Sequence, residues 1–200
     1  MKSMAFSRAR ASGARAGLTR ESVIAAAAEI ADREGLDALT LASLATKLGV
    51  RPPSLFNHVA GMPALRRELR TLALRELVEA LGAAAIGKSR GAAVHALADA
   101  YRKFVHDHPG IYALTLKATA DGAAATDAVG ERIVVICTSV LGGYSLGKRE
   151  TIHAIRAMRS LVHGFATLEA GGGFEMPVAI DASFAWMVEA FIAGLERITA

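Results

Sequence analysis

The sequence predicts an all-α fold of about nine helices within 200 residues. Alanine, the strongest helix former, makes up about one residue in five, and there are only five prolines. Apolar side chains recur at helical spacing in most segments, and no segment shows the strict alternation of a half-buried strand. A chain of this length can bury a sizeable apolar core, so a stable helical bundle is expected.

Three short helices are predicted near the N-terminus. A threonine suited to an N-cap precedes each of the first two, and a glycine suited to a C-cap follows each. The third opens with two prolines, which a first helical turn tolerates because no N–H is needed there. The expected helices are 20 to about 34, between Thr19 and Gly35; 41–48, between Thr40 and Gly49; and Pro52 to about His58.

Six more helices are predicted in the rest of the chain. The first is expected to open at Pro63, because Gly61 breaks the chain before it. A loop of small residues is expected near 82–91, and Asp181 is expected to cap the last helix. The first two expected helices span residues 63 to about 81, and from the loop of small residues to 106. The other four span residues 109 to about 116, 127–141, 148–169 and 181 to about 198.

The net charge of +4 is concentrated in the N-terminal part of the chain. Residues 1–80 contain 12 Lys/Arg and 8 Asp/Glu, whereas the remaining residues contain 11 of each. Two stretches in this part have basic residues and no acid, namely 1–20 and the segment between Asp37 and Glu68. They predict an N-terminal domain that faces a polyanion such as nucleic acid. A disordered basic tail beside a solvated helix face would account for the charge equally well.

Residues 40–59 fit the helix-turn-helix motif. Ala45 provides the small residue that is needed where the two helices cross. Gly49, four residues later, provides the positive φ that the turn requires. The apolar residues at the positions where the motif buries side chains are Leu44, Leu48, Val50 and Leu55.

The run TLASLATKLGVRPPSLFNHV, residues 40–59, resembles the tetracycline-repressor (TetR) family of transcriptional regulators. The run RSLVHGFATLEAGGGF, residues 159–174, resembles the WHG type of regulatory domain. Together with the basic N-terminus, the resemblance implies a flexible arm over 1–18, a helix-turn-helix domain over 19–64 and a ligand-binding and dimerisation domain over 65–200. It implies a cytoplasmic homodimer that binds double-stranded operator DNA and leaves it on binding a small molecule. It implies neither an enzyme nor a cofactor.

The resemblance also implies that the third helix enters the DNA major groove. There Arg51 would read guanine and Asn57 would read adenine, each through paired hydrogen bonds. Family members commonly have tyrosine where this chain has Phe56, and lysine where it has Met62, so two phosphate contacts are missing. The expected DNA-contacting residues are Thr40, Ser43, Arg51, Pro53, Ser54, Phe56, Asn57 and His58.

The regulatory part is implied to hold a ligand cavity among helices four to eight and a dimer interface on the last two. A polar stripe runs along 148–169 between two apolar sides, so it is expected to need partners, in a pocket or in the dimer interface. A stripe that is exposed or faces the dimer partner, with no ligand role, is at least as consistent with the pattern. The candidate cavity residues are Phe104, Tyr112, Cys137, Arg159 and His163. The candidate dimer residues, equally consistent with plain core, are Phe184, Val188, Phe191 and Leu195.

Other kinds of site have weaker support. Gly82 to Ser89 fits the phosphate-loop pattern GxxxxGK[ST], which would indicate a small nucleotide-binding protein. A phosphate loop requires a strand before it, whereas a helical segment precedes Gly82, so a flexible hinge between two helices is the favoured interpretation. The histidines lack metal-site spacing, so neither a metal nor a catalytic site is expected. The single Cys137 has no flanking base or nearby cation, which indicates an inert core thiol in a reducing compartment. No apolar run approaches the ~20 residues of a membrane helix, so no membrane partner is expected.

Overall fold

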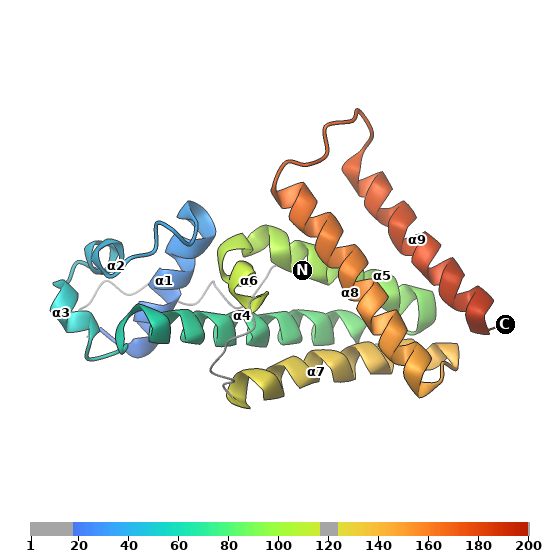
Figure 1. Cartoon of the computed structure of the whole chain (residues 1–200), viewed down its shortest axis with the longest axis horizontal. Helices are drawn as coiled ribbons and strands as arrows, with labels where there is room; N and C mark the ends of the chain where they lie inside the picture. The colour runs from blue at the N-terminus through green and yellow to red at the C-terminus, as the bar shows by residue number, and fades with distance from the viewer. Residues whose placement is uncertain (1–17, 117–123, 200) are drawn as a thin grey trace.

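The computed structural model describes residues 18–116 and 124–199, and every regular element in that part of the chain is a helix (Figure 1). The predicted all-α fold is therefore confirmed. The predicted arm lies outside the described residues except for Leu18, which is half-buried against the apolar core. Leu18 is thus part of the folded domain.

Three short helices form one end of the molecule (Figure 1). The side chains of Thr19 and Thr40 cap the first two, each in a reciprocal capping box with the serine three residues later. The third helix is shorter than predicted, because residues 56–58 form a turn. These helices are α1 (Arg20–Glu34), α2 (Leu41–Leu48) and α3 (Pro52–Leu55).

The longest helix, α4 (Gly61–Ala85), extends from beneath these three helices to the opposite end of the molecule (Figure 1). It begins two residues before the predicted Pro63. It also continues through Gly82, so the predicted loop over 82–91 is reduced to residues 86–89. Its leucine face is buried along the whole length, which makes α4 the common support of both ends of the chain.

The remaining helices pack around α4 (Figure 1). Three of them contact α4 directly, and the last two cross over α5. A short 3₁₀ helix joins α7 to α8, and α7 begins three residues before the predicted start. These elements are α5 (Arg90–Asp107), α6 (Pro109–Thr115), α7 (Ala124–Leu141), η1 (Gly142–Tyr144), α8 (Lys148–Ala170) and α9 (Ile180–Thr199).

The predicted dimer residues on α9 mostly belong to the core of the single chain. Phe184, Val188 and Leu195 are 2%, 4% and 4% exposed, because the stripe that they form faces α5 and α8, so a partner chain cannot reach them. Phe191 is half-buried. Of the predicted dimer residues, only Phe191 is left near the surface.

Arg102 of α5 fixes the start of α9. Its Nε donates a hydrogen bond of 2.7 Å to Glu169 of α8, and its Nη2 lies 2.8 Å from a carboxylate oxygen of Asp181. The guanidinium also lies over the ring of Phe184, 4.7 Å from its centre. Asp181, predicted as a cap, therefore sits inside the first turn of α9 as an ion-pair partner.

No single helix in the described part of the chain is long and apolar enough to cross a membrane. One pair, Ala128–Tyr144 with Lys148–Ala170, meets the length and composition criteria only when taken together, and it is bent by 115° at its break.

Candidate functional site

The turn between α2 and α3 has the geometry that the helix-turn-helix motif requires. Gly49 adopts φ 67° and ψ 29°, a left-handed conformation that favours glycine. The N–H of Val50 donates to the Ala45 carbonyl at 3.0 Å, which closes the end of α2. Leu44, Ala45 and Leu55 are fully buried beneath the turn, and this holds α3 in place.

The outer face of α3 and of the turn after it is open to solvent. Arg51, Pro53 and Asn57 are exposed, and Ser54 and His58 are half-buried. Phe56 is 58% exposed, which is unusual for a large aromatic side chain. All six predicted groove-facing residues therefore lie at least partly on the surface of one short segment.

Thr40 and Ser43 sit at the N-terminus of α2, but their hydroxyls are engaged in the cap. The Ser43 N–H donates to Thr40 Oγ1 at 3.0 Å, and Ser43 Oγ donates to the Ala38 carbonyl at 2.8 Å. The Thr40 hydroxyl donates to Ser43 Oγ at 3.1 Å. A phosphate at this position would therefore meet chiefly the backbone N–H groups of the first helical turn.

The positive charge at this end is smaller than the sequence indicates. Lys47 Nζ lies 3.2 Å from a carboxylate oxygen of Glu29 on α1, and Arg33 pairs with the same carboxylate at 2.9 Å, so the charge of Lys47 is partly offset. Arg51, Arg66 and Arg67 are exposed and form no ion pair with the described residues. These three arginines are the cations that this end of the folded chain presents to a polyanion.

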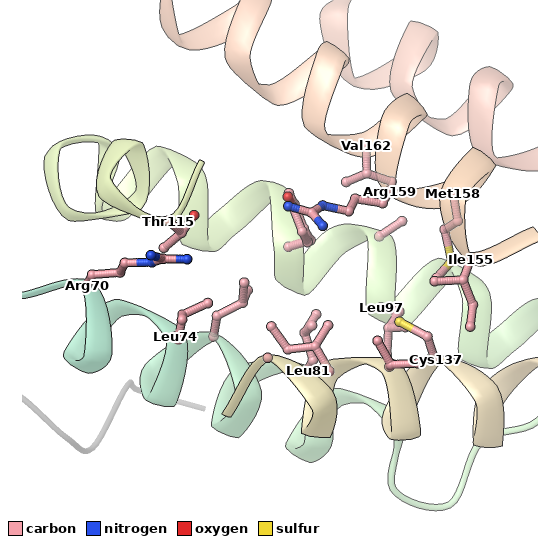
Figure 2. Close-up of a pocket in the computed structure, with 16 residues that line it drawn as sticks. Arg70, Leu74, Leu81, Leu97, Thr115, Cys137, Ile155, Met158, Arg159 and Val162 are labelled. Atoms are coloured by element: carbon pink, nitrogen blue, oxygen red, sulfur yellow. The ribbon is translucent and has the colours of Figure 1, made fainter. Parts of the chain in front are cut away.

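A cavity of about 320 Å³ lies between α4, α5, α6, α7 and α8 (Figure 2). Its walls are mainly leucine, isoleucine, valine and methionine side chains. Arg70 from α4 and Arg159 from α8 extend toward it from two different helices (Figure 2). The remaining polar groups that line it are those of Tyr101, Thr115 and Cys137.

Two of the five predicted cavity residues, Cys137 and Arg159, line this space. The other three do not line it: Tyr112 and His163 belong to a hydrogen-bonded chain behind Tyr101, and Phe104 packs against that chain. The Tyr112 hydroxyl oxygen lies 2.6 Å from that of Tyr101 and 2.6 Å from His163 Nδ1. The Phe104 ring packs edge-on against Tyr112, with centroids 6.4 Å apart.

The apolar residues of the cavity wall were not predicted from the sequence, and neither were three of its polar residues, Arg70, Tyr101 and Thr115. A usable indication existed for Arg70, since it falls on the same face of α4 as Leu74, Leu77 and Leu81, at spacings of four, three and four. Tyr101 likewise lies four residues after Leu97, another residue of the cavity wall.

Burial and Arg159 together set the protonation of the groups around the cavity. Burial raises the pKa of Cys137 to about 11, although the charge of Arg159 acts in the opposite direction. The expectation of no nearby cation was wrong, because Arg159 of another helix lines the same cavity and its charge acts on the thiol. Burial, and then the positive charge of Arg159, lower the pKa of His163, so its imidazole is neutral at pH 7. Burial also raises the pKa of the Tyr101 hydroxyl, which stays protonated.

The helical polar stripe predicted on α8 mostly faces solvent. Arg149, His153, Arg156 and Ser160 are exposed, and only His163 is half-buried against the tyrosine pair. In the single chain the stripe therefore does not line the cavity for most of its length, and its exposure agrees with a dimer-facing or a solvent-facing stripe.

Helix α6 joins the cavity to the N-terminal helices. Asp32 at the end of α1 accepts a hydrogen bond of 2.9 Å from the Ile111 N–H and lies 2.9 Å from His108 Nδ1. Gly110 lies so close to α1 that a Cβ atom there would be 2.0 Å from the Ala31 carbonyl oxygen. The hydrogen bond to Asp32 raises the pKa of His108 despite its burial.

The phosphate-loop alternative is contradicted by the local structure. Gly82 lies inside α4, and the segment before it is helix where a phosphate loop needs a strand. The described residues contain no group of three or more His, Cys, Asp or Glu side chains placed to hold a metal ion.

Comparisons with known proteins agree with this geometry. Residues 94–191 match the family described as "Tetracyclin repressor-like, C-terminal domain". The uncharacterized HTH-type transcriptional regulator YobS of Bacillus subtilis (strain 168) is 38% identical over 183 residues, which cover 90% of this chain and 94% of the relative. A solved protein of unknown function from Rhodococcus sp. RHA1 is 25% identical with a TM-score of 0.77, covering 93% of this chain and 100% of that one. A TetR variant from Acinetobacter baumannii AYE, in complex with minocycline, shares the fold with a TM-score of 0.67 at 24% identity, covering 92% and 99%.

Proposed function

The chain belongs to the tetracycline-repressor family of transcriptional regulators. We propose that it is a homodimeric repressor that leaves its operator DNA when a small molecule enters the α4–α8 cavity. Residues 19–64 form the DNA-binding domain and residues 65–200 the ligand-binding and dimerisation domain. The protein acts in the cytoplasm, where it reaches its DNA, and it uses no cofactor.

In this proposal the exposed face of α3 enters the major groove. Arg51 reads guanine through a bidentate contact and Asn57 reads adenine, each contributing about 1–3 kcal/mol of discrimination. Arg66 and Arg67 on α4, and the backbone N–H groups at the start of α2, bind phosphates and fix the orientation. The exposed ring of Phe56 packs along the sugar–phosphate edge.

The observation that supports ligand control is the continuity of α4 between the two regions. Leu65 and Leu69 lie in the apolar core with Leu55 below α3, while Leu77 and Leu81 of the same helix line the cavity. Helix α6 provides a second connection, since Thr115 lines the cavity and Ile111 is bonded to Asp32 of α1. A ligand that displaces α4 or α6 therefore tilts α3, and a dimer splayed in this way no longer matches its half-site spacing.

The dimer interface is placed on the outer surfaces of α8 and α9. Large apolar side chains are exposed there, which a lone soluble chain rarely leaves uncovered. Trp186 and Ile198 of α9 are 74% and 69% exposed, and Ile152 and Leu168 of α8 are 50% and 54% exposed. The buried stripe of Phe184, Val188 and Leu195 has no part in it.

The single cysteine allows a test that does not require the natural ligand. Cys137 lines the cavity, so hexyl methanethiosulfonate would form a mixed disulfide that leaves a hexyl chain inside it. Because burial raises the pKa of the thiol to about 11, labelling is carried out at pH 9 and verified by mass spectrometry. Affinity for a duplex from the DNA flanking the gene is then measured at neutral pH by fluorescence anisotropy.

The labelled protein is expected to bind that duplex at least about tenfold more weakly, within the usual range of coupling between two sites. The Cys137→Ser variant, treated with the same reagent, serves as the matched control and should keep its affinity. A labelled wild-type protein with unchanged affinity would contradict release through the cavity.

A further inference from the structure

We propose that the cavity takes an amphipathic anion, a monocarboxylate with an apolar body of medium length, whose carboxylate binds Arg159 and the Tyr101 hydroxyl. This inference rests on the proposed function, in which the cavity receives a small molecule, and it specifies the chemical class of that molecule.

The charge of the cavity wall favours an anion. Two arginines line it, Arg70 and Arg159, and no Asp or Glu is among the described lining residues. Arg159 forms no ion pair with any described residue. Arg159 is partly exposed to solvent at the cavity wall, and its planar fork matches a carboxylate that enters the cavity. A cationic ligand would be repelled by Arg159 and would find no acid among the described residues of the wall.

The neutral polar groups of the wall also suit an anion. The hydroxyls of Tyr101 and Tyr112 are both protonated because burial raises the pKa of each. Tyr112 accompanies Tyr101 at 2.6 Å, and His163 stands behind Tyr112 as a neutral imidazole. If His163 donates its Nδ1–H to Tyr112, Tyr112 donates to Tyr101 and Tyr101 donates to an incoming carboxylate, every contact in this chain of hydrogen bonds has one donor and one acceptor.

The rest of the wall suits an apolar body. Leu77, Leu81, Leu97 and Ile133 line the cavity and offer no hydrogen-bonding side chain. The volume of about 320 Å³ lies at the lower end of the range for small-molecule sites, about 300–1,000 Å³. A chain of about eight carbons with one terminal carboxylate therefore serves as a suitable probe.

The test compares three probes that share an octyl-length chain and differ in the head group: octanoate, 1-octanol and octylamine. Isothermal titration calorimetry on the full chain should give octanoate at least about tenfold tighter binding than either of the others. Arg159→Met should weaken octanoate about 10- to 100-fold, as expected for losing hydrogen bonds to a charged group, and leave 1-octanol unchanged. Arg156→Met is the matched control, because Arg156 is an exposed arginine of the same helix that does not line the cavity, and it should change none of the three.

The inference is overturned if octanoate does not bind, if 1-octanol or octylamine binds equally well, or if Arg159→Met weakens all three probes alike. Its failure is distinguishable from failure of the proposed function. If 1-octanol binds and releases promoter DNA while octanoate does not bind, the ligand class is wrong and ligand control stands. If octanoate binds through Arg159 without weakening the DNA complex, the ligand class stands and ligand control is wrong.

Discussion

The contact between α6 and α1 can be tested at Gly110, where one methyl group should separate the two helices. An alanine Cβ at this position would lie 2.0 Å from the Ala31 carbonyl oxygen, 2.2 Å from its carbon and 2.7 Å from the Asp32 nitrogen. These are backbone atoms, so no side chain can rotate away. A carbon–oxygen contact normally needs about 3.3 Å or more, so α6 would have to withdraw by roughly 1.3 Å.

Withdrawal should be costly in two ways. Overpacking of this kind costs about 1–3 kcal/mol. It also breaks the bond from the Ile111 N–H to Asp32, whose side chain is only 13% exposed, and an unsatisfied buried partner costs about 1–3 kcal/mol more. The helix propensity of alanine returns about 0.5–1 kcal/mol. The free energy of unfolding of Gly110→Ala should therefore fall by about 2–4 kcal/mol.

Urea denaturation followed by far-ultraviolet circular dichroism measures this change. Gly82→Ala in the last turn of α4 is the matched control, because its Cβ would meet only the Ile136 Cδ1 at 3.7 Å, an ordinary contact. That variant should gain about 0.5–1 kcal/mol from helix propensity alone. If Gly110→Ala is as stable as the wild type, or the two variants behave alike, α6 does not dock on α1 as described.

Three further predictions concern the joint between α6 and α1, the anchor of α9 and the N-terminal arm. Wild type should have a higher free energy of unfolding than His108→Gln below pH 6.5, the ordinary histidine pKa, and this difference should fade by pH 9, because Asp32 raises the pKa of the folded histidine. Denaturation at pH 6 and at pH 9 measures the difference. A difference that does not depend on pH would refute the ion pair. Arg102→Met should lower the free energy of unfolding by about 2 kcal/mol, because it removes the bonds to Glu169 and Asp181. The exposed Arg156→Met variant should not change the free energy of unfolding. Equal denaturation midpoints for the two variants would exclude Arg102 as the anchor of α9. Deleting the basic segment 1–17 should flatten the slope of log affinity against log salt by about 0.9 for each phosphate that this segment neutralises, and an unchanged slope would show that the segment does not touch DNA.

The parts of the fold that neighbouring residues encode were predictable from the sequence. The caps at Thr19 and Thr40 and the left-handed turn at Gly49 depend on side chains and backbone within a few positions of each other. The buried Leu44 and Leu55 follow from the spacing of the motif in the same way. The exposed face of α3 could therefore be named residue by residue.

Contacts between distant segments were not predictable in this way. Helical spacing groups Phe184, Val188 and Leu195 on one face, but it does not say whether that face meets its own α5 or a second chain. The ion pair between Lys47 and Glu29, and the effect of the Arg159 charge on the pKa of Cys137, each involve residues from different helices. Gly82 was predicted as a loop residue from composition, whereas packing against α7 keeps it helical.

The central claim, that the segment following Gly49 reads a DNA sequence, is tested most directly by a ratio of affinities. The duplex flanking the gene and a scrambled duplex of the same length and composition are compared at one salt concentration, for wild type, Arg51→Ala and Arg67→Ala. For wild type, the affinity for the flanking duplex divided by that for the scrambled duplex should be at least about a thousand. Arg51→Ala should lower this ratio about 10- to 100-fold. Arg67→Ala should weaken both complexes and leave the ratio unchanged. A wild-type ratio near one, or an Arg51→Ala variant that keeps the wild-type ratio, would contradict the claim.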